Sequence, residues 1–299
     1  MIRRLASALY ANAFLLLSLT ALFWAGNFVL GRGVHGHVPP IALAWWRWLL
    51  ATLIVLPFAW PHVRRDWPAI RENLPILIFL GATGAGAFNS IAYFSLNYTT
   101  ALNGVVMQSS APVLIVIASF LLFGDRIRPL QAFGIGLSLF GVMTMVARGE
   151  FAVLAEMSLN KGDIGLLIAM ATWAVYTAFL RKRPQIHWLS FITVTFGVAV
   201  LMNTPLMAIE HSSGWQMQFT EKTLLAILYV AIFPGLLAYI FFNRGVELIG
   251  ANRAGVFMHL VPFFGAALAM TLLGETPRLY HATGITLILT GVALAARKT

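Results

Sequence analysis

The chain has 299 residues, of which 60% are hydrophobic and only 10% are charged, and its mean hydropathy is +0.83. Soluble domains carry roughly a quarter charged residues, so this composition leaves too little polar surface for a soluble protein and favours a membrane protein. The net charge of +10 does not indicate nucleic-acid binding, because the basic residues are scattered singly between apolar runs, and the absence of cysteine excludes disulfides, thiolate metal sites and cysteine nucleophiles.

Apolar runs of about 20 residues predict membrane-spanning helices, because a helix of that length crosses the hydrocarbon core. The first run stays uncharged from Leu5 to Gly31, which is too long for the core of a signal peptide, so we interpret it as a retained span. The predicted spans are, in chain order, 11–30, 40–60, 74–95, 100–122, 129–148, 162–181, 188–209, 222–243, 251–273 and 279–296. The sequence therefore predicts an all-α membrane protein with ten transmembrane helices.

The second half of the chain repeats the first. Residues 98–148 align with residues 248–298 after a shift of 150 positions, without a gap. Prolines and glycines coincide under this shift: Pro112 with Pro262, Gly134 with Gly284, and Gly141 with Gly291. Trp24 and Trp173 stand 149 positions apart in the first span of each half. We predict two repeats, residues 1–149 and 150–299, and five helices in each would make the second repeat inverted in the membrane.

The distribution of lysine and arginine predicts the orientation of the chain. Both termini and the even-numbered connections hold 14 of these residues, and the odd-numbered connections hold 5. The remaining one, Arg47, lies inside the second span. Because positively charged connections stay in the cytoplasm, we expect both termini to be cytoplasmic.

Aromatic and amide side chains recur on single faces of four predicted spans, two from each repeat. The bilayer makes each polar group costly unless it has a partner or faces water. The candidates for substrate binding are Trp24, Asn27, Phe28, Asn89, Tyr93, Trp173, Tyr176, Tyr239 and Asn243. Such an interior suits a molecule with an apolar or aromatic body and a few hydrogen-bonding groups. The alternative for each residue is a place in the interfacial aromatic belt or between packed helices.

Arg47 lies about 10 Å along its helix from the Pro39-Pro40 start. A fixed cation there would hold a substrate carboxylate. The alternatives are that its side chain extends to the membrane surface or bonds a backbone carbonyl.

His259 and Gln108 are further candidates for substrate binding. His259 lies beside Pro262 and corresponds to Ser109, the neighbour of Gln108. The alternative is a buried neutral histidine that is bonded to a neighbour. Pro112 and Pro262 interrupt corresponding helices and are candidate hinges around a central site, with a plain kink as the alternative.

The positions of the acidic residues bear on ion coupling. All ten fall in connections or near helix ends, so we expect no carboxylate within the membrane to carry a coupling proton or sodium ion. Transport is then uncoupled, or weakly coupled through His259. The sequence shows no paired carboxylates, histidine cluster, nucleophile elbow or phosphate-binding glycine loop, so we expect no enzyme, no metal and no cofactor. The expected partners are a small-molecule substrate and the lipid bilayer, with the chain a monomer or weak dimer.

Several motifs together resemble a known family. They are Trp24-Ala25-Gly26-Asn27-Phe28, Arg47-Trp48-Leu49-Leu50-Ala51, the stretch Ala101 to Pro112, and the turns Gly124-Asp125 and Gly274-Glu275. Over nearly its whole length the chain resembles the paired EamA domains of the drug/metabolite transporter superfamily. The resemblance implies a ten-helix inverted-repeat exporter of amino acids, metabolites or drugs in a bacterial inner membrane. The aromatic interior is similar to that of exporters of aromatic and neutral amino acids of the YddG type. The chain departs from the family pattern at Asp125, where a glutamate is usual.

The sequence thus predicts an exporter of small metabolites, foremost aromatic and neutral amino acids, that works by alternating access between the two repeats. A multidrug or other metabolite exporter is the first alternative, although the predicted interior lacks an acidic residue to attract a cation. A membrane-embedded transferase or lipid-processing enzyme would need a catalytic base that the spans do not supply. A passive channel would fit a polar pore better than these aromatic faces.

Overall fold

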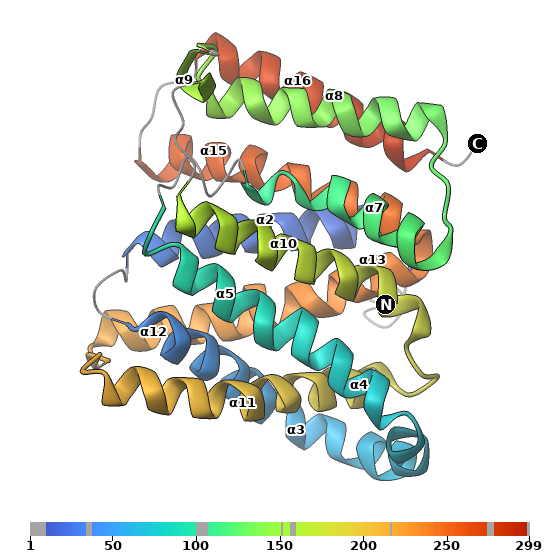
Figure 1. The fold of residues 1–299 in the computed structure, drawn as a ribbon, viewed down its shortest axis with the longest axis vertical. Helices are drawn as coiled ribbons and strands as arrows, with labels where there is room; N and C mark the ends of the chain where they lie inside the picture. The colour runs from blue at the N-terminus through green and yellow to red at the C-terminus, as the bar shows by residue number, and fades with distance from the viewer. Residues whose placement is uncertain are drawn as a thin grey trace, which may run out of the picture.

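The computed structural model describes residues 10–33, 38–99, 107–150, 152–155, 160–215, 217–273 and 278–297. Every regular element in these ranges is a helix (Figure 1). The elements before residue 150 are α2 (Ala13–Gly33), α3 (Pro40–Glu72), α4 (Leu74–Leu80), the π-helix η1 (Gly81–Ala87), α5 (Phe88–Ser95), α7 (Ala111–Phe123) and α8 (Pro129–Val146). Those after it are α9 (Ala152–Ala155), α10 (Lys161–Phe179), the 3-10 helix η2 (Leu180–Lys182), α11 (Trp188–Ser212), α12 (Glu221–Val230), the π-helix η3 (Ala231–Leu237), α13 (Ala238–Ile249), α14 (Ala251–Val256), the 3-10 helix η4 (Phe257–His259), α15 (Leu260–Leu273) and α16 (Leu279–Ala296).

Seven helical stretches among the described residues are long and apolar enough to cross a membrane. They are Pro40–Glu72, Leu74–Ser95, Pro129–Val146, Lys161–Lys182, Trp188–Ser212, Glu221–Ile249 and Leu279–Ala296. Each overlaps one predicted span. The other predicted spans overlap the shorter apolar helices Ala13–Asn27 and Ala111–Phe123, and the stretch α14 to α15 that η4 interrupts. The all-helical membrane protein is confirmed, and the count of ten spans stays a prediction.

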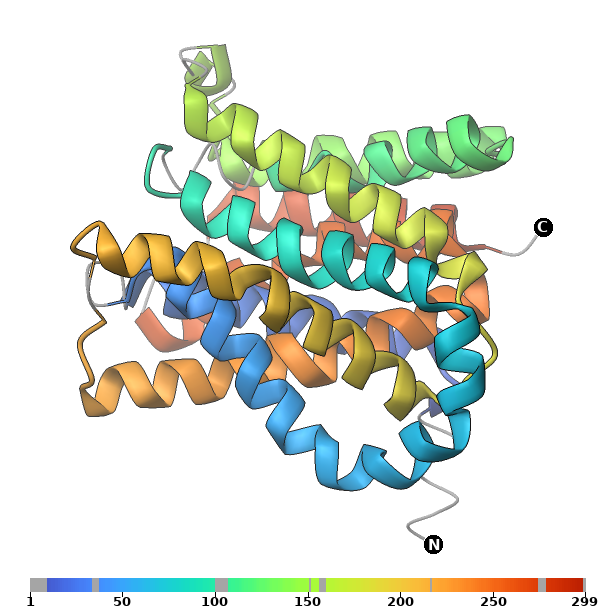
Figure 2. The same cartoon turned by 60° about the horizontal axis from the view of Figure 1, so that its bottom comes forward.

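Helix α3 is longer than the sequence predicted. Its predicted end lay near residue 60, but the helix continues to Glu72 through Pro57, Pro61 and Pro68. A proline inside a helix removes one backbone donor and bends the helix. The ribbon of α3 accordingly turns before it reaches α4 (Figure 2). This extension brings Asp66 to the start of α11.

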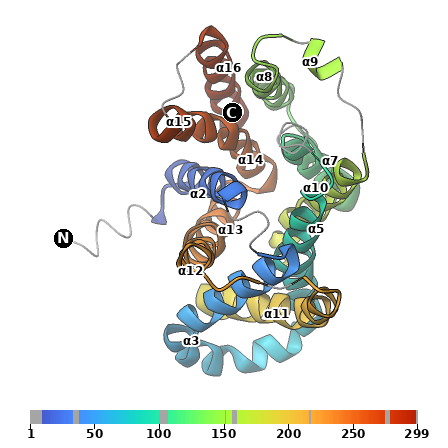
Figure 3. The same cartoon turned by 90° about the vertical axis from the view of Figure 1, so that its left-hand side faces the viewer.

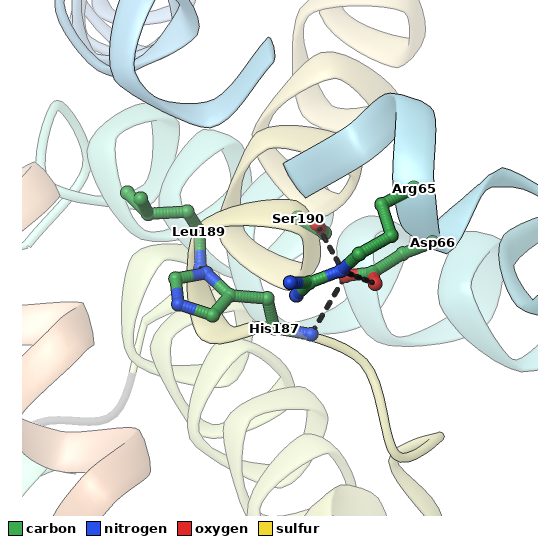
Figure 4. Close-up of polar contacts among 5 residues, drawn as sticks. All are labelled: Arg65, Asp66, His187, Leu189 and Ser190. Atoms are coloured by element: carbon green, nitrogen blue, oxygen red, sulfur yellow. Dashed lines mark hydrogen bonds and ion pairs between the residues drawn. The ribbon is translucent and has the colours of Figure 1, made fainter. Parts of the chain in front are cut away.

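Carboxylates join α3 and α11 at both ends of the pair. Asp66 accepts hydrogen bonds from the backbone N of His187 at 2.8 Å and from the Ser190 hydroxyl at 2.7 Å (Figure 4). Glu210, near the end of α11, accepts from the backbone N of Ile41 at 3.0 Å and of Ala42 at 2.8 Å, at the start of α3. A carboxylate at a helix N-terminus satisfies free donors and interacts favourably with the helix dipole. Two of the acidic residues near helix ends therefore hold this helix pair together.

Helices α8 and α16 lie side by side and approach each other closely at glycines (Figures 1 and 3). A Cβ atom at Gly134 would lie 2.6 Å from the carbonyl oxygen of Gly291, and one at Gly141 would lie 2.8 Å from that of Gly284. Because the 150-residue shift relates Gly134 to Gly284 and Gly141 to Gly291, each glycine faces the counterpart of the other. Small residues permit the close backbone approach that drives helix association in lipid.

The remaining close helix pairs also combine elements from both sides of residue 150. Helix α2 packs on α13, α5 packs on α10, and α3 packs on α11. The two π-helices η1 and η3 begin at Gly81 and Ala231, exactly 150 positions apart. A π-helical turn departs from the regular i to i+4 ladder and often marks a functional site. The sequence analysis predicted neither π-helix.

Candidate functional site

Trp24 of α2 and Trp173 of α10 meet at the centre of the fold. Their ring centroids are 5.2 Å apart and their planes are inclined at 85°. Both rings also contact Tyr239 and Phe242 of α13. We call the set of rings packed here the central cluster: Trp24, Trp48, Phe88, Trp173, Tyr176, Tyr239 and Phe242. The two tryptophans that coincide in the repeat thus form one contact.

Two tyrosine-asparagine hydrogen bonds flank the central cluster. The hydroxyl of Tyr93 donates to Asn27 Oδ1 at 3.3 Å, and that of Tyr176 donates to Asn243 Oδ1 at 2.6 Å. Asn27 is related to Tyr176 by 149 positions and Tyr93 to Asn243 by 150, so the same pair recurs with its members exchanged. Tyr176 and Asn243 are buried, with 2% and 5% exposure, whereas Asn27 and Tyr93 are half-buried.

A third polar contact links α5 to α13 between these pairs. Asn89 Nδ2 donates to the hydroxyl of Tyr239 at 3.1 Å, and that hydroxyl donates to the carbonyl oxygen of Gly84 at 2.6 Å. Gly84 lies in the π-helix η1. Its counterpart in η3 is Pro234, whose carbonyl oxygen accepts from Trp24 Nε1 at 3.3 Å. Corresponding carbonyls of the two π-helices therefore bond side chains of the site.

Arg47 of α3 is 2% exposed and lies against the central cluster. Its Nη1 donates to the hydroxyl of Tyr93 at 2.7 Å, and its Nη2 donates to the carbonyl oxygen of Pro234 at 2.7 Å. Its guanidinium carbon lies 4.9 Å from the ring centroid of Trp48. The bond to a backbone carbonyl, one of the alternatives from the sequence, is present, and the side chain does not reach the surface. Four ion pairs occur among the described residues, and none includes Arg47.

His259 lies apart from the central cluster, in the 3-10 helix η4. Its Nε2 is 3.0 Å from the carbonyl oxygen of Ser109, and its Nδ1 is 2.6 Å from the hydroxyl of Ser138. Because a carbonyl only accepts, Nε2 carries a proton, and in the neutral ring Nδ1 accepts from the Ser138 hydroxyl, which also lies 3.0 Å from the carbonyl oxygen of Ile135. Both ring nitrogens of this fully buried side chain are thus engaged within the protein, which is the arrangement of a structural neutral histidine. Gln108 is partly buried beside Ser109.

The candidate hinges lie at helix starts. Pro112 is in the first turn of α7, and Pro262 is in the first turn of α15, directly after η4. Proline is well tolerated there because the donors of a first turn lack partners within the helix. The side chain of Phe28 and the turn Gly274-Glu275 lie outside the described part of the chain.

The structure adds residues that the sequence analysis did not select. Trp48 is fully buried, Phe242 is 1% exposed, and both pack on Trp173 or Tyr239. The sequence did indicate Trp48, because this residue directly follows Arg47 inside a predicted span. The backbone carbonyls of Gly84 and Pro234 could not be selected from side-chain chemistry. The glycines and proline at corresponding positions of the two halves nevertheless indicate where the helices are irregular.

Comparisons with known proteins agree with the fold and the resemblance. The sequence profile of the EamA-like transporter family matches residues 11–147 and 160–297. The chain is 24% identical over 294 residues to the uncharacterized transporter YyaM of Bacillus subtilis, covering 96% of this chain and 94% of that protein. It is 27% identical over 295 residues to a probable amino-acid metabolite efflux pump of Salmonella typhimurium, covering 92% and 91%. A crystal structure with 18% identity has the same fold, with a TM-score of 0.75 over 95% of this chain and 96% of that one. The chain therefore belongs to the EamA-like transporter family and is a multi-pass membrane transporter.

Proposed function

We propose that this transporter exports aromatic and neutral amino acids across the bacterial inner membrane, with the substrate bound at the central cluster. One observation carries the proposal: corresponding residues of the two repeats, Trp24 and Trp173, meet at the centre and are flanked by exchanged tyrosine-asparagine pairs. Transporters with inverted repeats bind substrate where the repeats meet. Aromatic walls with a few hydrogen-bonding groups suit an amino acid with an apolar side chain. A relative named as a probable amino-acid metabolite efflux pump supports a substrate of this kind.

The proposed architecture is ten helices in two inverted repeats, residues 1–149 and 150–299, with both termini cytoplasmic. The exchanged glycine contacts between α8 and α16 support it, because contacts of this kind arise when two copies are related by a twofold axis. The offset of 150 positions between η1 and η3 supports it as well.

Alternating access follows from this topology. The predicted orientation puts Asn27 and Tyr93 toward the outer face and Tyr176 and Asn243 toward the cytoplasm. The cytoplasmic pair is buried and its hydrogen bond is the shorter one, which supports a conformation that is closed more tightly toward the cytoplasm. In the opposite conformation the outer pair closes and the cytoplasmic pair separates. Pro112 and Pro262, at helix starts, are the proposed hinges.

Flux measurements with purified full-length protein in liposomes test the proposal. The probes are labelled L-phenylalanine, L-tryptophan, L-threonine and L-methionine, with and without a pH gradient. We expect saturable flux that Trp173→Ala lowers by about tenfold, because loss of the central ring removes aromatic contact with the substrate. Trp215→Ala removes a ring that is 49% exposed and serves as the matched control.

Two results would change the proposal. Flux of cationic drugs without flux of any amino acid would move the function to the multidrug alternative. In the second result, flux follows the pH gradient in the native chain but not in His259→Gln. That result would assign proton coupling to His259, although both of its ring nitrogens are engaged within the protein.

A further inference from the structure

Arg47 is a buried cation with no carboxylate partner among the described residues. Its two hydrogen-bond acceptors, the Tyr93 hydroxyl and the Pro234 carbonyl, are both neutral. A buried charge needs a compensating charge or a very complete set of hydrogen bonds, and ionisable residues within membrane spans typically line substrate pathways. No carboxylate of the described part of the chain therefore neutralises the charge of Arg47 in this conformation, although its guanidinium carbon lies 4.9 Å from the ring centroid of Trp48.

The side chains around Tyr239 offer free donors. Arg47 Nε, Trp48 Nε1 and Trp173 Nε1 are buried and have no hydrogen-bond partner among the described residues. The ring of Tyr239 lies 4.9 Å from that of Trp48 and 5.5 Å from that of Trp173, and 6.0 Å from the guanidinium carbon of Arg47. A buried donor without an acceptor is destabilising, so three around one ring require an explanation. All three donors lack an acceptor among the described residues.

We propose that Arg47 binds the carboxylate of the transported substrate. The inference rests on the proposed function, because the central cluster is taken as the place where substrate binds. A planar guanidinium pairs with a carboxylate through two parallel hydrogen bonds, and the pair is stronger than a bond to a neutral carbonyl. On binding, the Nη2 donor leaves the Pro234 carbonyl for the carboxylate, and Trp24 Nε1 remains as a donor to that carbonyl.

The same arrangement selects against other charge types. An organic cation would meet the unneutralised guanidinium at close range and be repelled. A ligand with one negative charge neutralises the single buried cation, whereas a dianion would leave one buried charge unpaired. The site is therefore matched to a single carboxylate, and a neutral amino acid, which is a zwitterion, would bind with its ammonium group turned away from Arg47.

Binding and flux are measured separately to test this assignment. Binding is followed by the quenching of tryptophan fluorescence in purified full-length protein. The probes are L-phenylalanine, L-tryptophan, L-threonine, L-methionine and the carboxamide of each. Because L-tryptophan and its carboxamide fluoresce themselves, their binding is measured by competition with another probe. We expect native protein to bind the acid about 10- to 100-fold more tightly than its carboxamide, as befits a charge-assisted pair. Arg47→Gln should abolish this preference, and Arg47→Lys should restore part of it. Arg71→Gln removes an exposed arginine of the same helix and should keep the preference.

The outcomes separate this inference from the proposed function. Amino-acid flux in the native chain together with an unchanged acid preference in Arg47→Gln overturns the role of Arg47 and leaves the function standing. Arg47-dependent binding of acids without flux supports the site and refutes amino-acid export. Where Arg47→Gln does not fold, the native chain alone decides, since equal binding of acid and carboxamide, or no binding of either, overturns the inference.

Discussion

The contact between α8 and α16 makes a sharp prediction about two glycines of one helix. A Cβ at Gly134 would lie 2.6 Å from the carbonyl oxygen of Gly291 and from the backbone N of Ala295, whereas a Cβ at Gly136 would meet nothing within 4 Å. In Gly134→Ala the helices must separate by about 0.8 Å, a gap that forfeits a quarter to a half of the dispersion energy of neighbouring atom pairs. Overpacking of this kind costs about 1–3 kcal/mol.

The two substitutions should therefore act in opposite directions. Alanine gains about 0.5–1 kcal/mol over glycine within a helix, so Gly136→Ala should stabilise the protein slightly. That gain offsets only part of the cost in Gly134→Ala, which should lose about 1–2 kcal/mol of unfolding free energy. Unfolding of the purified protein in micelles by added SDS measures both. Equal shifts of the same sign would refute the close approach of α8 and α16.

Three further predictions concern polar contacts. Asp66→Asn removes the charge at the start of α11 and should lower the unfolding free energy by about 1 kcal/mol. Glu72→Gln changes an exposed carboxylate of the same helix and should not lower it. Equal losses of stability in thermal unfolding would contradict the capping role of Asp66. Tyr176→Phe leaves the buried Asn243 Oδ1 without its hydroxyl donor and should reduce flux in liposomes more than Tyr93→Phe does. Equal reductions would count against the asymmetry of the two tyrosine-asparagine pairs. Burial and the stacked His62, whose ring centroid is 3.7 Å away, lower the pKa of His187 below its ordinary 6.5, and its Nδ1 accepts from Leu189 N. The unfolded chain then binds the proton more readily than the folded one, so the unfolding free energy should fall as pH drops below 6.5. His187→Gln should remove that part of the pH profile, and an unchanged profile would argue against it.

Local properties of the chain were sufficient to predict the class of the protein and many candidate residues. Hydropathy over about 20 residues is a property of each segment alone, which is why most spans were found within a few residues. The gapless shift of 150 positions likewise matched the glycines of α8 with those of α16, and an offset of 149 positions matched Trp24 with Trp173, before any contact was known. The excess length of α3 was missed, because prolines ordinarily end a helix, and here the helix bends at them instead.

Only the tertiary structure decided which partner each polar group takes. Tyr93 could have bonded any amide on its side of the membrane, and the rotation of α2 against α5 selects Asn27. Arg47 reaches a carbonyl 187 positions away because η3 departs from the regular helical ladder exactly where α3 passes. His259 was a candidate for substrate binding because of its position in the sequence, but the packing of α8 brings the Ser138 hydroxyl to its ring. Helical periodicity determines the face on which a side chain lies, whereas helix rotation, crossing and local backbone geometry determine what that face meets.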